Sequence, residues 1–165
     1  MKRLLLSFSL LTTIFFMASC TGGGGTAGMV GSWGLSYFEW QEYLDGELYD
    51  EDSYEYNPTN PSSDDDMKLE ISHVDGNDYL FKSYEWSPRN NDWKQITSFT
   101  MTIEGGKATY DGETITFKTS GNTLTITTEE TDIDEDGSWV YRTKNVYKRL
   151  SGGDNETETP ATPLF

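Results

Sequence analysis

The sequence predicts an all-β protein, a small antiparallel up-and-down barrel of about eight strands. Residues 114–118 and 123–127 alternate Thr or Lys with Ile, Phe or Leu, and a period of two places the apolar side chains on one face of a sheet. Short runs of this kind recur with Gly, Asp and Asn between them, and residues 20–165 contain no helical pattern of useful length. Because the hairpin turns after residue 67 are tight, they favour a barrel over a Greek-key sandwich.

The first 19 residues have the pattern of a secretion signal. Lys2 and Arg3 precede an apolar stretch at residues 4–16, which is shorter than the roughly 20 residues needed to span a bilayer. Small residues then lead into Cys20, and this junction resembles the lipobox of bacterial lipoproteins, although Met17 stands where Leu is usual. The resemblance implies cleavage before Cys20 and acylation of its side chain. The alternative is an ordinary signal peptide with an incidental cysteine.

Charge and cysteine content limit the partners. The chain carries a net charge of −16, which is repelled by phosphate backbones, so no nucleic-acid partner is expected. Cys20 is the only cysteine, so the exported domain has no disulfide. The expected partner is the membrane, reached through the lipid anchor. The expected location is the cell envelope, on the outer membrane and facing the periplasm.

The chain divides into four segments. Residues 1–19 are expected to be the lipoprotein signal peptide, and residues 20–28 the acylated Cys with a flexible Gly-rich leash. The barrel domain is expected over residues 29–150. Residues 151–165 are polar and contain two prolines, which indicates a disordered tail.

The barrel begins with an aromatic strand at residues 29–43. Simple alternation places Trp33, Leu35 and Tyr37 on one side, with Phe38 and Trp40 on the other. Residues 44–66 are rich in acids, tyrosines and prolines, and they predict a long loop with a weak strand near Tyr54 and Tyr56.

Seven further strands are expected. The runs at residues 67–73 and 79–86 flank Asp75-Gly76-Asn77, a hairpin signal. The remaining strands begin at about residues 96, 107, 114, 123 and 138. Eight strands enclose room for side chains or for one small ligand.

Three short motifs resemble the lipocalin-like lipoproteins of Bacteroidota: Gly31-Ser32-Trp33, Gly121-Asn122-Thr123-Leu124 and Tyr147-Lys148-Arg149-Leu150. The resemblance implies a lipid-tethered barrel over residues 29–150 with no established common ligand. It also implies that Trp33 packs under Arg149 to close one barrel end, with the guanidinium within about 6 Å of the ring centroid. Arg142 is the alternative partner.

Catalysis and cofactors are not expected. His73, the only histidine, continues the strand of Leu69 and Ile71 and is better explained as a strand-end residue than as a general base. Two-carboxylate hydrolysis is open on residue types, because acids are plentiful, but most of them fall in turns and loops.

One acidic motif resembles a metal loop. Asp132, Asp134, Asp136 and Gly137 match the first half of a calcium-binding loop, but Thr143 stands where a bidentate acid is required. An acidic hairpin loop is therefore preferred, and these aspartates are a weak metal candidate.

Three functions remain open, in this order. The first is a lipid-anchored barrel that binds a small apolar ligand or is a packed scaffold. The second is a surface carbohydrate- or protein-binding module that uses the acidic aromatic segment at residues 38–66. The third is an enzyme. An open interior would favour a carrier, whereas a filled interior with exposed Tyr43, Tyr49 and Tyr54 would favour the surface module.

Overall fold

The computed structural model describes residues 28–110, 112–135 and 137–151. The expected signal peptide, Cys20, most of the leash and the expected tail after residue 151 lie outside this part of the chain. The described residues form strands, turns and loops, and none of them forms a helix able to cross a membrane. The nine strands are β1 Gly31–Leu44, β2 Glu47–Glu55, β3 Met67–Asp75, β4 Asp78–Ser87, β5 Asp92–Thr102, β6 Lys107–Tyr110, β7 Glu113–Ser120, β8 Thr123–Asp134 and β9 Gly137–Ser151.

The strands form one antiparallel sheet in the order β5-β4-β3-β1-β9-β8-β7-β6. The two end strands, β5 and β6, follow each other in the chain and meet through a bridge between Glu104 and Lys107. Gly105 and Gly106 make the turn between them with φ values of 57° and 78°. The sheet therefore curls into an up-and-down barrel, as the sequence predicted.

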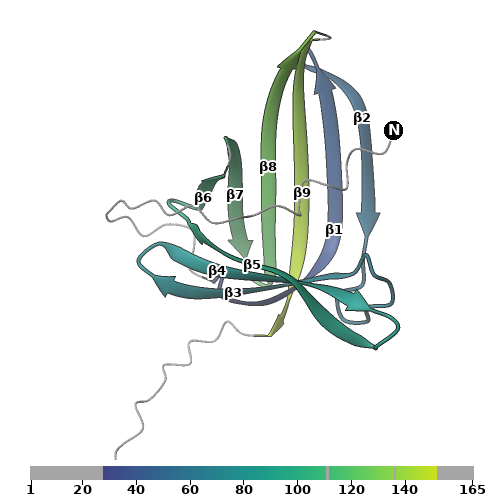
Figure 1. The fold of residues 1–165 in the computed structure, drawn as a ribbon, viewed down its shortest axis with the longest axis vertical. Helices are drawn as coiled ribbons and strands as arrows, with labels where there is room; N and C mark the ends of the chain where they lie inside the picture. The colour runs from purple at the N-terminus through teal and green to yellow at the C-terminus, as the bar shows by residue number, and fades with distance from the viewer. Residues whose placement is uncertain (1–27, 111, 136, 152–165) are drawn as a thin grey trace, which may run out of the picture.

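Strand β1 changes partner halfway along its length. Residues 31–34 pair with β3, whereas residues 37–44 pair with β2, and β9 lies along the other edge throughout. Figure 1 shows β2, β1, β9 and β8 rising together past the layer made by β3, β4 and β5. We call this part the extension: residues 37–44 of β1, all of β2, residues 127–134 of β8 and residues 137–146 of β9.

The barrel interior is packed with apolar side chains. The ring of Phe81 lies 5.3 Å from that of Phe99 and 5.7 Å from that of Phe117, between centroids. Burial of such rings supplies most of the stability of a domain without disulfides. The buried hydrophobic residues are Met29, Trp33, Leu35, Leu69, Ile71, Tyr79, Phe81, Ile103, Ala108, Phe117, Leu124 and Tyr147.

The long loop predicted at residues 44–66 is wrong over its first half, where the weak strand predicted near Tyr54 is the end of a longer strand. Residues 47–55 form β2, which pairs with β1, so the sheet has nine strands and the loop covers only residues 56–66. Every residue of β2 is exposed, so the strand lacks the apolar alternation that would reveal it. The signal was Asp45-Gly46, whose positive φ values of 51° and 85° suit a two-residue hairpin turn.

The side assigned to Tyr37 is also wrong. The register of β1 against β9 shifts between Leu35 and Tyr37, a β-bulge that places Tyr37 opposite Val146. Tyr37 therefore faces away from the side of Trp33 and Leu35. Phe38 and Trp40 instead continue that side beyond the barrel.

Candidate binding site on the strand extension

The two residues expected to close the barrel are in contact. The Cζ atom of Arg149 lies 4.0 Å from the ring centroid of Trp33, which is fully buried. The Arg149 guanidinium donates to the carbonyl oxygens of Val30, at 2.9 Å, and Gly28. The indole Nε1 of Trp33 donates to the carbonyl of Met29 at 2.7 Å. This end of the barrel thus ties the first strand to the last, and Arg142 lies elsewhere, over the ring of Tyr43.

The described aspartates of the weak metal candidate accept hydrogen bonds from neighbouring N–H groups. Asp132 and Asp134 lie in strand β8 rather than in the expected loop, and Asp136 is outside the described residues. An Asp132 oxygen accepts from the N–H of Ile133, and an Asp134 oxygen accepts from the Gly137 N–H and the Trp139 indole. Within the described residues no three His, Cys, Asp or Glu side chains are grouped to hold a metal.

His73 is exposed at the end of β3. Its Nε2 lies 2.9 Å from the carbonyl oxygen of Gly76, and its ring makes an edge contact with Tyr79. These contacts hold it against the β3–β4 turn.

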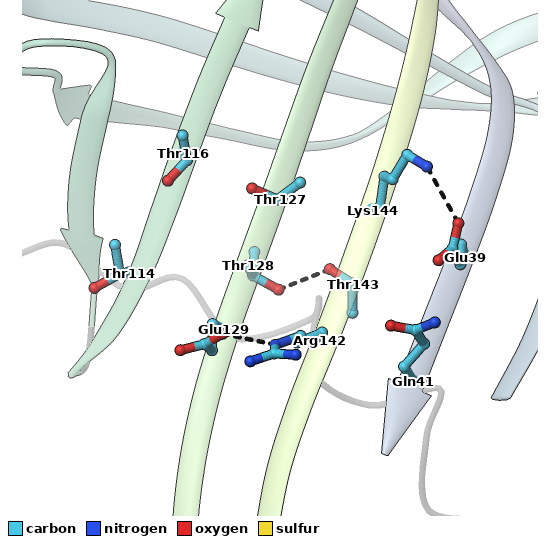
Figure 2. Close-up of a pocket in the computed structure, with 10 residues that line it drawn as sticks. All are labelled: Glu39, Gln41, Thr114, Thr116, Thr127, Thr128, Glu129, Arg142, Thr143 and Lys144. Atoms are coloured by element: carbon cyan, nitrogen blue, oxygen red, sulfur yellow. Dashed lines mark hydrogen bonds and ion pairs between the residues drawn. The ribbon is translucent and has the colours of Figure 1, made fainter. Parts of the chain in front are cut away.

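The outer face of the extension is polar and internally paired. A hollow of about 440 Å³ lies over it, lined mainly by threonines of β7 and β8 and by charged residues of β1, β8 and β9. Figure 2 shows the two ion pairs of this hollow, Arg142 with Glu129 at 2.7 Å and Lys144 with Glu39 at 3.2 Å.

Each outer cation also covers a tyrosine ring. Arg142 lies 4.8 Å from the centroid of Tyr43, and Lys144 lies 5.3 Å from that of Tyr37. The Tyr37 hydroxyl donates to Glu39 at 2.9 Å. This bond, together with Lys144, lowers the pKa of Glu39. Both cations of the outer face are therefore paired within that face.

The inner face of the extension continues the core side of the barrel, and it is aromatic. The rings of Phe38 and Tyr54 stack at 6.4 Å, and those of Trp139 and Tyr141 stack at 6.2 Å. Tyr49 and Tyr54 are 65% and 48% exposed, so both rings remain accessible from solvent. Tyr49 lies at a bulge of β2 and is placed on this face by its edge contact with the Trp139 ring, at 5.1 Å between centroids. Strand pairing assigns these further residues to the inner face: Phe38, Trp40, Glu42, Leu44, Asp50, Asp52, Tyr54, Glu130, Asp132, Trp139, Tyr141 and Thr143.

Carboxylates are interleaved with these rings. Glu42 stands directly opposite Asp50, and Glu130 stands opposite Tyr141. Burial, and then the charge of Asp50, raises the pKa of Glu42. Burial and the neighbouring carboxylates, Glu42 foremost, raise the pKa of Tyr141. Among the described residues of this face there is no Lys or Arg. The inner face therefore combines flat apolar surfaces with uncompensated negative charge.

Part of this face could be recognised from the sequence. Of the three tyrosines whose exposure would favour a surface module, Tyr49 and Tyr54 are exposed and lie on this face, whereas Tyr43 lies on the outer face under Arg142. Trp139 and Tyr141 were missed because residues 138–150 were expected to complete the barrel. Only the pairing of β9 with β1 brings Trp139 and Tyr141 beside the aromatic residues of β1 and β2.

The fold and this face define an all-β barrel with an aromatic, acidic strand extension. No protein-family model matches the chain, and no curated protein matches it. Among solved structures, the siderocalin Ex-FABP, described as functioning through dual ligand specificities, has 11% identity and a TM-score of 0.41, over 73% of this chain and 72% of its own.

Two further solved structures are similar over nearly their whole length. Zebrafish ileal bile acid-binding protein complexed with cholic acid has 17% identity and a TM-score of 0.39, over 74% of this chain and 99% of its own. A mutant of the fluorescent protein UnaG has 16% identity and a TM-score of 0.25, over 74% of this chain and 96% of its own. At these values no function is transferred from them.

Proposed function

We propose that this protein is a cell-envelope lipoprotein that binds a ligand on the inner face of its extension. Cys20 carries the anchor, and the chain faces the periplasm from the outer membrane. The barrel is a packed scaffold that holds the face away from the membrane. Binding, rather than catalysis, is the proposed activity.

One observation carries this proposal: the barrel interior is filled while the adjoining aromatic face is open. Trp33, Phe81 and Leu124 are at most 2% exposed and occupy the interior that a carried ligand would need. Phe38 and Trp40 continue the same side of β1 beyond the barrel, where both are half-buried and the neighbouring rings of Tyr49 and Tyr54 are exposed. Exposed aromatic patches of this kind mark interaction sites.

The anchor is supported by the sequence motif at residues 17–20 alone. Cys20→Ala is expected to release the protein from the membrane fraction while the barrel stays folded, because Cys20 precedes every strand of the described residues. Fractionation with circular dichroism checks both points. A Cys20→Ala protein that still sediments with membranes would contradict the anchor.

The binding face is tested by a panel of peptides and oligosaccharides against the full chain in detergent. We expect a ligand whose binding is lost when Trp40 or Trp139 is changed to Ala, since each presents a flat ring on the inner face. The matched control is Trp93→Ala, which breaks a ring contact with Trp86 at 5.3 Å between β4 and β5. Ligand binding that survives both inner-face changes would refute the proposed face.

A further inference from the structure

The molecule contains a recurring arrangement of a tyrosine, a carboxylate and a cation. In it, the Tyr hydroxyl donates to the carboxylate, and a Lys ammonium both pairs with that carboxylate and covers the Tyr ring. Tyr37, Glu39 and Lys144 form one example on the outer face (Figure 2 draws Glu39 and Lys144). Tyr84, Glu70 and Lys68 form the second, with the hydroxyl bond at 2.6 Å and the ammonium 4.2 Å from the ring centroid.

The inner face contains the same arrangement without a cation of its own. The Tyr54 hydroxyl donates to Asp52 at 2.6 Å, as in the other two groups. No Lys or Arg of the described residues pairs with Asp52 or covers the Tyr54 ring. Trp40 stands opposite Asp52 and Phe38 stands opposite Tyr54, so the carboxylate has aromatic neighbours on the next strand.

A second group lies farther along the same face. Glu42 and Asp50 face each other across β1 and β2, and Tyr141 stands opposite Glu42 on β9. Two acids in directly opposed positions repel each other. A cation between them and the Tyr141 ring would remove that repulsion and add a cation–π contact.

The edges of the extension discourage strand addition. The backbone N–H groups of Glu51 and Ser53 donate to the side chains of Asp50 and Asp52, at 2.9 and 2.7 Å. Charged, capped edges oppose pairing with another strand, and a net charge of −16 opposes a second copy of this chain. A partner is therefore expected to contact the face rather than the edge.

From these observations we propose that the inner face binds an extended basic segment of a partner protein. One Lys or Arg of that segment sits over Tyr54 beside Asp52, and a second sits between Glu42 and Asp50. Asp52 and Asp50 are two residues apart on β2, so the two cations are two residues apart in the segment. This assignment rests on the proposed function and names its partner class.

The test uses the full chain in detergent and an alternating Lys-Ser octapeptide, with a Glu-Ser octapeptide and neutral chito-oligosaccharides as comparison ligands. The double variant Glu42→Gln with Asp52→Asn keeps side-chain shape and removes two charges. It should weaken binding of the Lys-Ser peptide about tenfold, the effect of two lost ion pairs. The matched control, Asp75→Asn with Glu104→Gln, removes the same charge from exposed turns of the barrel and should change the dissociation constant less than about twofold.

The outcomes separate the two proposals. Equal weakening by both double variants would mean attraction by net charge alone and would overturn the basic-segment assignment. Binding of neutral chito-oligosaccharide that depends on Trp40, with none of the Lys-Ser peptide, would overturn that assignment but leave the proposed binding face standing. If no ligand responds to Trp40→Ala or Trp139→Ala, both proposals fail.

Discussion

Arg149 ties the last strand of the barrel to the first through its contact with Trp33. Changing it to Ala removes a guanidinium 4.0 Å from the Trp33 ring and its bonds to the carbonyls of Val30 and Gly28. The expected loss is about 2 kcal/mol in the free energy of unfolding, measured by urea denaturation. Arg142→Ala is the matched control, because that exposed cation also covers a ring and should cost less than about 1 kcal/mol. Equal losses in the two variants would argue against a closure role for Arg149.

Glu42 is expected to lower stability at neutral pH. Its pKa is raised in the folded state, so the folded chain binds the proton more tightly than the unfolded chain does. The stability contributed by this group is therefore present in acid. It is lost as the pH rises through the ordinary pKa of 4.5 and then through the raised pKa of the folded state. Glu42→Gln should stabilise the protein at pH 7 by about 0.5 kcal/mol, as for relief of a like-charge cross-strand pair.

That gain should shrink toward zero in acid, where Glu42 is protonated in both states. Urea denaturation of both proteins at neutral and acid pH measures it. The matched control is Glu39→Gln, because Tyr37 and Lys144 lower the pKa of Glu39 and the sign should reverse. A destabilised Glu42→Gln protein at pH 7 would show that burial and the Asp50 charge do not disfavour the charged form of Glu42 in the folded state.

At the scale of strands, β2 and the far end of β8 are the exposed borders of the extension. Asp50, Asp52 and Asp132 each accept from the N–H of the following residue. Changing all three to Ala removes both the caps and the charge, so these edges should pair with other chains. We expect sedimentation to rise with concentration for the triple variant only. A triple variant that stays monomeric would mean that the caps are not what keeps these edges apart.

How far the sequence predicts the elements depends on burial. The strands from Met67 onwards carry alternating apolar residues, because one face packs on the core, and their order along the chain was predictable. Strand β2 has no buried face, and its local signals are the Asp45-Gly46 turn that precedes it and the weak strand pattern near Tyr54. The bulge after Leu35 has no local signature, since it depends on how β9 pairs with β1. The bulge decides which face Phe38 and Trp40 occupy, so the local sequence pattern could not place these two residues of the candidate site.

At the scale of the molecule, a single sheet forms both the packed barrel and the extension. Its lower part curls around the buried core, whereas its upper part stands clear of the other strands (Figure 1). The chain's cations in the extension, Arg142 and Lys144, lie on the outer face, and the carboxylates beside Trp40 and Tyr141 lie on the inner one. This separation of charge should make binding of a basic ligand fall steeply with salt. Titration at low and physiological ionic strength checks it, and salt-independent binding would contradict an electrostatic contribution.

The most direct test of the binding face uses the five tryptophans. With 5-fluorotryptophan incorporated, fluorine NMR of the full chain in nanodiscs reports each ring separately once single Trp→Phe variants assign the signals. On addition of the Lys-Ser peptide, we expect the signals of Trp40 and Trp139 to shift. Those of Trp33, Trp86 and Trp93 should stay in place. A 12-carbon fatty acid should leave the Trp33 signal unchanged, because the interior around that ring is filled. A Trp33 shift with either ligand, while Trp40 and Trp139 stay unmoved, would place the ligand inside the barrel and contradict the account.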